Sequence, residues 1–215
     1  MNLTIVRKNI KNINITIRSN GEVLVSAPKR VSKRYIDELI KKKTPWIKKK
    51  LDYFKGRKSL TVKKSYDDGE KIYYLGEEFI LKVVECSEER VWLEDGFLWL
   101  AVRSERDIAA KERLVDSWYL SKAKKLFEEL VKKYQKIVKR DIKIVRIKKM
   151  KTRWGSCNHV RGYINLNLYL IQRDIKEIEY VVLHELAHLI YPNHSKEFYN
   201  YIASIMPDWK ERRIG

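Results

Sequence analysis

The sequence predicts an α+β fold, in which short β-strands and long amphipathic helices occupy separate stretches of the chain. Short alternating apolar runs fill residues 3–27 and 71–102, and each of these stretches is followed by a segment with helical periodicity, at residues 32–54 and 107–139. A last pair of strands precedes a third helical segment at residues 174–190. These observations together favour small sheets packed on helices.

The length of 215 residues suits one sizeable domain or two small ones, with enough apolar content for a real core. We expect a basic, β-rich N-terminal portion with an inserted helix at residues 1–103 and a second domain at residues 104–215. Cys86 and Cys157 lie far apart and form no C-x-x-C pair, so the sequence predicts neither a disulfide framework nor a thiolate zinc site.

The segment Met1–Lys8 lacks the apolar run of a secretory signal, and no uncharged stretch is long enough to span a bilayer. We therefore expect a soluble, cytoplasmic protein with no membrane partner.

The positive charge is concentrated at the N-terminus. Residues 1–64 hold 19 Lys and Arg against 4 Asp and Glu, a net charge of +15 out of a total of +19. Such a concentration can attract nucleic acid, an anionic membrane or an acidic protein, or it can be a solvated basic face. A second basic stretch, residues 132–153, holds 11 Lys and Arg and a single acid, Asp141. Charge alone does not select the partner.

The N-terminal runs 3–7, 13–18 and 23–27 predict a small antiparallel meander, with Ser19-Asn20-Gly21 as a hairpin turn. From Ser32 the pattern becomes helical, and Pro45 predicts either two helices or one kinked helix that ends near Phe54. The aromatic residues of this helix have two interpretations, core packing or stacking on bases, and core packing is the more frequent of the two. They are Trp46, Tyr53 and Phe54.

The elements that follow are predicted from turns and periodicity. Residues 56–70 look like a polar connection, and the next four strands are expected at residues 71–74, 78–84, 90–93 and 97–102. The helix at 107–139 is expected to pack under the third helical segment. Two further strands, at residues 143–153 and 162–167, are joined by residues 154–161 and suggest a sheet edge to which an extended peptide could add.

The third helical segment carries the chemistry. Asp174 is a suitable N-cap, and His184 and His188 are one turn apart on one face, so both imidazoles can reach one ion. Glu185 projects near that ion without binding it, which is where the general base of a hydrolytic zinc site belongs. Pro192 disfavours helical geometry at the preceding residue, so the chain is expected to turn back.

That turn would bring His194 to the ion as a third ligand, which leaves a fourth position open, as in catalytic Zn²⁺ sites. Glu197 has two interpretations: an acid that the helix dipole favours in the first turn after the cap Ser195, or a metal ligand in place of His194. His159, the remaining histidine, is expected to be a turn residue rather than a ligand.

The C-terminal part of the chain resembles the YgjP-like metallopeptidases, which are distant relatives of the SprT-like zincin proteases. The strongest matches cover about the last 65 residues, and the N-terminal half matches only in outline. The matching segments are Trp154–Cys157, Gly162–Asn167, Tyr180–Leu189, Asn193–Ser195 with Phe198, and Met206–Lys210.

The resemblance implies a zincin-like C-terminal metallopeptidase core, made of a small antiparallel sheet, a long helix and the H-E-x-x-H helix. It also implies a zinc-dependent peptidase with His184, His188 and His194 as ligands and Glu185 as base. Tyr191 stands where metzincin proteases have a glycine, so its hydroxyl could face the cleft as an oxyanion donor, although packing is the more frequent role. The rival hypotheses are a basic nucleic-acid-binding protein with structural zinc, or a protease that acts on DNA-associated proteins.

Overall fold

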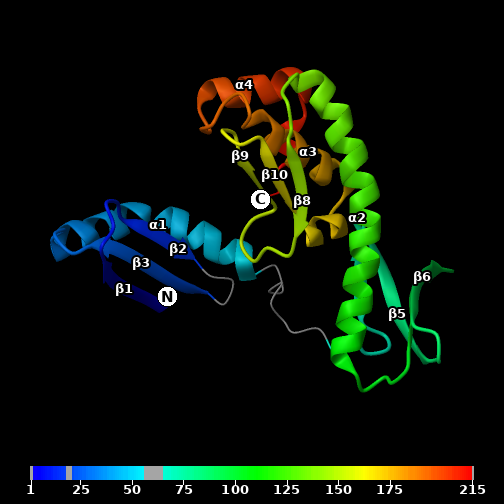
Figure 1. The fold of residues 1–215 in the computed structure, drawn as a ribbon. Helices are drawn as coiled ribbons and strands as arrows, with labels where there is room; N and C mark the ends of the chain where they lie inside the picture. The colour runs from blue at the N-terminus through cyan, green and yellow to red at the C-terminus, as the bar shows by residue number, and fades with distance from the viewer. Residues whose placement is uncertain (1, 18–20, 56–64, 215) are drawn as a thin grey trace. The chain divides into compact units, whose positions relative to one another are not determined.

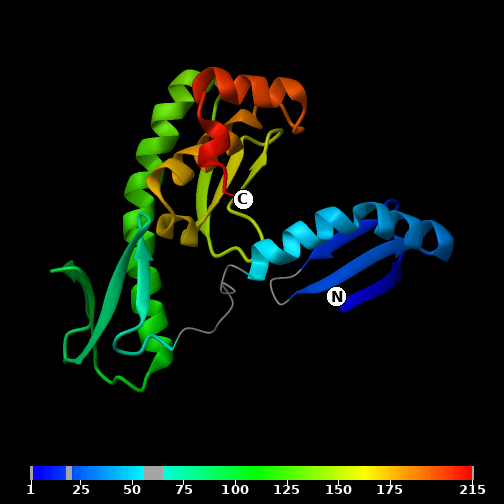
Figure 2. The same ribbon diagram turned by 180° about the vertical axis from the view of Figure 1, so that it is seen from behind.

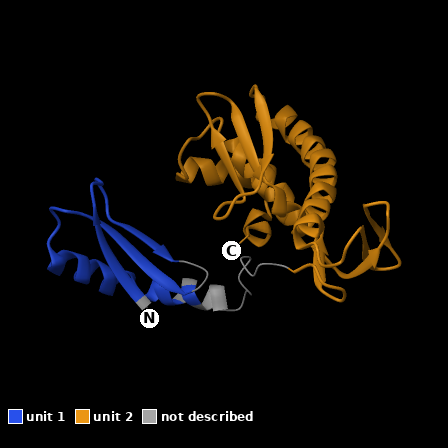
Figure 3. Ribbon diagram, turned by 60° about the horizontal axis from the view of Figure 1, so that its bottom comes forward, with its two compact units in different colours: residues 1–63 blue, residues 64–215 orange. Residues whose placement is uncertain are grey.

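The computed structural model describes residues 2–17, 21–55 and 65–214, and the chain divides into two compact units, residues 1–63 and 64–215 (Figure 3). The expected domain boundary between residues 103 and 104 falls inside the second unit. This is because the strands at residues 71–102 share one hydrophobic core with the helices that follow, through buried side chains such as Leu98, Leu100 and Val115.

The first unit contains a three-stranded sheet of β1 (Asn2–Lys8), β2 (Asn14–Ile17) and β3 (Glu22–Pro28), in the order β1-β3-β2. β2 and β3 are antiparallel, as predicted, but β1 and β3 are parallel, so the prediction of an antiparallel meander is wrong. β3 is the most deeply buried strand and takes the centre, where both of its edges find backbone partners. Ser19 and Asn20 of the expected turn lie outside the described residues.

The sheet packs against α1 (Lys33–Lys55), which is one helix that runs through Pro45 rather than two. The Ser32 hydroxyl accepts a hydrogen bond from the Tyr35 backbone N–H, as expected for an N-cap (3.3 Å). The Thr44 hydroxyl donates to the Ile40 carbonyl beside the proline (2.8 Å). Ile36 on the inner face of the helix is fully buried against β3.

The second unit begins with a four-stranded sheet whose strands lie where the sequence predicts them. They are β4 (Lys71–Tyr74), β5 (Glu77–Glu85), β6 (Arg90–Glu94) and β7 (Phe97–Val102), in the order β4-β5-β7-β6. The turn between β4 and β5 contacts the segment that precedes the H-E-x-x-H helix, since the Leu75 N–H donates to the Ile171 carbonyl (2.9 Å). Gly76, with a φ of +86°, has Asp174 so close that a Cβ would lie 3.0 Å from the Asp174 Cα.

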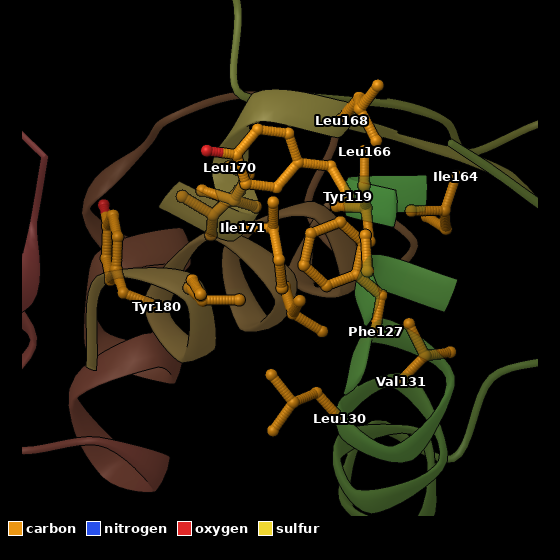
Figure 4. Packing of buried hydrophobic residues seen from close by; sticks show 14 of the residues in the cluster. Tyr119, Phe127, Leu130, Val131, Ile164, Leu166, Leu168, Leu170, Ile171 and Tyr180 are labelled. Carbon is orange, nitrogen blue, oxygen red and sulfur yellow. The ribbon is translucent and has the colours of Figure 1, made fainter. Parts of the chain in front are cut away.

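The predicted long helix is α2 (Ile108–Val138), which the Asp107 side chain caps and Lys139 ends in a left-handed conformation. As expected, α2 packs against the H-E-x-x-H helix, α3 (Ile175–Ala187), and it also runs along the four-stranded sheet (Figures 1 and 2). Figure 4 shows Tyr119 and Phe127 of α2 packed among the apolar side chains that precede α3. Packing in this core therefore fixes the position of α3 and its rotation about its own axis.

The third sheet lies beside α3 and contains β8 (Ile144–Lys148), β9 (Gly155–Asn158) and β10 (Tyr163–Asn167), in the order β8-β10-β9. The sequence predicts only β8, which ends at Lys148 rather than Arg153, and β10; β9 falls in the segment expected to join them. β8 and β10 are parallel, whereas β9 and β10 are antiparallel, so the expected antiparallel sheet is a mixed one.

The remaining elements are the 3-10 helix η1 (Leu168–Gln172), α4 (Lys196–Ile205) and α5 (Trp209–Arg212). α4 begins at the predicted cap, Ser195. Within the described part of the chain, no helix combines the length and the apolar character that crossing a bilayer requires.

Candidate metal centre

Two of the candidate ligands lie on α3. The Asp174 side chain caps this helix by accepting a hydrogen bond from the Lys176 N–H (2.7 Å). The apolar stripe of α3 is buried in the core, and the opposite positions carry His184 near the end of the helix and His188 at its C-cap. The ring centroids of the two histidines are 4.9 Å apart.

α3 ends at Ala187, three residues before the predicted end, and residues 188–190 continue it as a turn. The Leu189 N–H donates to the Leu186 carbonyl and the Tyr191 N–H to the Ala187 carbonyl, so the chain stays wound up to Pro192. It then turns back into the cap of α4, and this turn places His194 over the end of α3. The Nε2 atoms of His194 and His184 are 2.9 Å apart.

The structure therefore brings all three predicted ligands together. One nitrogen from each of His184, His188 and His194 lies within 4.8 Å of the others. Among the described residues, this is the one group of three or more His, Cys, Asp or Glu side chains close enough to hold a metal ion. Imidazole nitrogen is a ligand that zinc and several other transition metals prefer.

Outer groups orient two of the rings. The Nδ1 atom of His188 lies 3.1 Å from the Tyr191 carbonyl oxygen, which can only accept, so Nδ1 carries the proton and Nε2 keeps its lone pair. The Nδ1 atom of His184 lies 3.3 Å from the Tyr180 hydroxyl. Tyr180 is itself held by Trp209: the two rings are stacked, with their centroids 6.2 Å apart. The inner nitrogens are thus turned toward one another.

Phe198 of α4 forms an apolar floor under the cluster. It is fully buried, and its ring centroid lies 4.7 to 5.0 Å from those of the three histidines. Burial, and then the neighbouring histidines, lower the pKa of His184 to about 3. Burial also lowers the pKa values of His188 and His194. The three imidazoles are therefore neutral near pH 7, which is the form that binds a metal, so this donor set fits zinc.

Glu185 directly follows His184 on α3 and is only 6% exposed. Its side chain passes directly over Gly155 of β9, where a Cβ would lie 2.5 Å from the Glu185 Cγ. Burial raises the pKa of Glu185 to about 8, and the positive charge of Arg153 opposes this rise. The pKa of Cys157, also on β9, rises to about 12 because of burial and then the charge of Glu185. β9 and α3 therefore hold the carboxyl between them.

The alternative candidates lie elsewhere. Glu197 is exposed in the first turn of α4, where hydrogen bonds from Ser195 and its own N–H lower its pKa, and it is not part of the histidine cluster. The Tyr191 ring packs on Tyr201, with centroids 5.6 Å apart. His159 lies in the turn between β9 and β10 and is exposed, as predicted.

Sequence reasoning missed the supporting residues. Tyr180 is four residues before His184, a spacing that placed it on the same face of the helix, but a tyrosine in an apolar stripe gives no sign of a polar role. Gly155 falls in a segment that was expected to be a loop, so its contact with Glu185 depends on a strand that the sequence does not predict.

Two solved structures of metallopeptidase zymogens are similar to part of the chain, abylysin of Pyrococcus abyssi and jannalysin of Methanocaldococcus jannaschii. The first is 28% identical, with a TM-score of 0.37 over 40% of this chain and 87% of that chain. The second is 24% identical, with a TM-score of 0.36 over 40% and 88%. No curated protein matches the chain.

The family model of the YgjP-like metallopeptidase domain matches residues 11–214, which is nearly the whole chain. The histidine cluster lies within the matched part. A metallopeptidase hydrolyses peptide bonds with the help of a metal cofactor. The chain therefore belongs to the YgjP-like metallopeptidase family, and it is a peptidase.

Proposed function

We propose that the protein is a zinc-dependent peptidase in which His184, His188 and His194 hold the metal and Glu185 is the general base. The observation that carries this proposal is the position of Glu185. Glu185 directly follows the candidate ligand His184 on α3, and its carboxyl is buried in a slot that exists because residue 155 is glycine. A purely structural metal site would have no use for a buried carboxyl at that place.

A zinc ion in this site would polarise the attacking water and the scissile carbonyl, and it would lower the pKa of that water toward about 7. Glu185 takes one proton from the water as the water oxygen bonds to the carbonyl carbon. It then delivers this proton to the leaving nitrogen as the C–N bond breaks. Burial raises the pKa of Glu185, and the positive charge of a bound metal ion would oppose this rise and favour the carboxylate form that accepts the proton.

β9 is the proposed support for the substrate. It lies at the edge of its sheet and pairs with β10 alone among the described strands. An extended peptide can add to such an edge by main-chain hydrogen bonds. Because Gly155 at the start of β9 contacts Glu185, a peptide on this edge would pass close to the base.

The test combines metal analysis with a proteome-wide cleavage screen. We expect purified wild-type protein to hold one zinc ion, and Glu185→Gln to keep the zinc but lose turnover. Full activity of Glu185→Gln would end the proposed mechanism. His194→Ala should lose most of the metal, with Glu197→Gln as the matched control; loss of zinc from the control instead would make Glu197 the third ligand.

A second candidate function is association with nucleic acid, so that the peptidase acts on nucleic-acid-bound proteins. The observation that favours it is the outer surface of α1, where Lys41, Lys42 and Lys43 are exposed and Trp46 is 44% exposed rather than in the core. The test measures DNA binding by the full chain at several salt concentrations. Replacing these three lysines by glutamine should weaken binding and its salt dependence, whereas replacing Lys122, Lys124 and Lys125 of α2 should not.

A further inference from the structure

The second basic stretch of the sequence, residues 132–153, has no part in the proposed catalysis. It covers the end of α2, the whole of β8 and the segment that leads to β9. Of its 11 Lys and Arg residues, Lys133 and Lys149 form ion pairs with carboxylates of the described part of the chain, which leaves nine without such a partner. All nine are exposed. Uncompensated positive charge therefore surrounds β8.

β8 is an edge strand. It pairs with β10 alone among the described strands and lies at the opposite side of the sheet from β9 (Figure 1). The Ile144 N–H donates to the Gly162 carbonyl on the β10 side (3.4 Å), and alternate residues of a strand direct their backbone groups to opposite sides. The backbone groups of Val145 and Ile147 therefore point away from β10, and no described residue forms a hydrogen bond with them. Such an edge can pair with one more extended chain.

A hollow lies between α2 and the start of this edge. Its volume is about 230 Å³, and its lining comes from one side of α2 and from residues 142–145. The aliphatic side chains of Ile142, Ile144 and Val145 are only half-buried there. Small-molecule pockets usually have volumes of about 300–1,000 Å³, so this hollow suits a side chain of a longer ligand rather than a whole small molecule.

Cations lie along the same edge. Lys132 of α2 and Lys143 before β8 line the hollow, in which Glu128 is the one acid of the described lining. Arg146 of β8 is exposed and lies over the Tyr163 ring of β10, with its guanidinium carbon 5.0 Å from the ring centroid. This contact holds the guanidinium group in place, while its N–H groups stay able to bind a carboxylate.

The edge, the hollow and the charge together select the occupant. Nucleic acid would bind the cations, but it has no main-chain N–H and C=O groups to pair with a strand. A second copy of β8 would place like charges opposite one another, which destabilises strand pairing. An extended polypeptide rich in Asp and Glu can pair with the edge, fill the hollow with a side chain and match the charge.

We propose that β8 docks an acidic, extended segment of a partner polypeptide as an additional strand. The docking surface consists of the free edge of β8, the hollow beside it, and Lys132, Lys143 and Arg146. β8 and β9 end the strand order at opposite sides, so this surface is separate from the edge proposed to support the scissile peptide. The inference therefore goes beyond the proposed catalytic mechanism and does not depend on it.

The binding experiment uses the full chain with Glu185→Gln, and mass spectrometry checks that the probe stays intact. The main probe is a short, end-capped fluorescent peptide in which Glu and Val alternate. One matched peptide carries Gln in place of each Glu. Two others carry N-methyl groups on the amides of every Glu or of every Val, which blocks one edge of the strand or the other. A short fluorescent oligothymidine tests binding by charge alone.

We expect the Glu-Val peptide to bind about tenfold more tightly than its Gln version at low salt. One N-methylated peptide should lose binding and the other should keep it, because an added strand pairs through one of its edges. Hydrogen exchange of residues 142–150 should slow when the peptide binds, and exchange in β9 should not change.

Two double variants locate the charge. Lys143→Gln with Arg146→Gln should lower the affinity for the Glu-Val peptide about tenfold at low salt. The matched control, Lys122→Gln with Arg103→Gln, also removes one exposed lysine and one exposed arginine from the second unit, but away from β8. The control should bind the peptide as tightly as the unsubstituted background.

Four results would overturn the proposal. They are equal affinity for the Glu and Gln peptides, full binding by both N-methylated peptides, equal affinity of the two double variants, and slower exchange in β9 rather than in residues 142–150. The last result would mean that the peptide binds as a substrate does. Oligothymidine that binds more tightly than the peptide and slows exchange of residues 142–150 would assign the surface to nucleic acid instead. None of these outcomes bears on whether Glu185 is the base.

Discussion

Replacing Gly155 by alanine tests how the proposed base, Glu185, is held in position. Its methyl group would lie 2.5 Å from the Cγ, 2.7 Å from the Oε1 and 2.8 Å from the Cδ of Glu185. Nonbonded carbon atoms prefer separations of about 3.5–4.0 Å, so the carboxyl must move by about 1 Å. Gly155 has no positive φ, and the cost is therefore steric rather than conformational. Overpacking of this kind destabilises a protein by about 1–3 kcal/mol.

A base displaced by about 1 Å loses about 10²-fold in rate. We therefore expect Gly155→Ala to lower kcat/KM about 100-fold while the zinc content stays at the wild-type value, because the three histidines are untouched. The assays are peptide hydrolysis, metal analysis and denaturant unfolding. Gly96→Ala is the control: its φ of +80° costs an alanine about 1–2 kcal/mol, but no atom lies within 4 Å of the new Cβ. Gly96→Ala should lose stability and keep kcat.

Two results would refute the reasoning. Wild-type kcat/KM in Gly155→Ala would show that the contact with Glu185 does not position the base. An equal loss of activity in Gly96→Ala would show that lowered stability, rather than displacement, is the cause. In the Glu185→Gln background, Gly155→Ala should cause little further loss of activity, because the group that it displaces no longer acts.

Three further predictions concern the surroundings of the metal centre. Because burial raises the pKa of Glu185 from 4.5 to about 8, folding the metal-free protein becomes less favourable as the pH rises through this range. Chelator-treated Glu185→Gln should therefore gain unfolding free energy relative to wild type with rising pH, and a constant difference would contradict this. Tyr180→Phe removes the hydrogen bond to His184 Nδ1 and should weaken zinc binding about 10-fold in a chelator competition, with little change in Tm; unchanged affinity would count against it. Alkylation at pH 8 should label exposed Cys86 and leave Cys157, whose pKa is raised to about 12, as the unlabelled thiol in mass spectra; equal labelling would show that Cys157 is not buried as described.

The histidine cluster could be predicted because it depends on short-range rules. Helical spacing alone places His184 and His188 on one face of the helix. Pro192 alone indicates that the helix must end before it. The predicted N-cap, Ser195, begins α4 directly after His194, so His194 lies in the turn between α3 and α4. Each of these statements involves residues only a few positions apart, and the structure follows them even though α3 ends three residues early.

Strand pairing could not be predicted in the same way. The strands β4 to β7 lie where alternation and turns place them, yet the order β4-β5-β7-β6 includes a parallel pair. The first and third sheets also contain one parallel pair each. Which strand takes the centre depends on the burial of whole strands against helices, and a pattern within one strand does not carry this information.

β9 shows why the sequence signal fails at the site itself. Its residues, Gly155, Ser156, Cys157 and Asn158, include none of the β-branched or aromatic side chains that mark a strand, and glycine weakens a strand further. Any Cβ at position 155 would displace Glu185, so the glycine that weakens the strand signal is also the residue that makes room for the Glu185 carboxyl. The β9 residues have a low strand propensity, and pairing with β10 holds the strand in its place. The same contact explains why a weak strand lies next to the most deeply buried acid of the site.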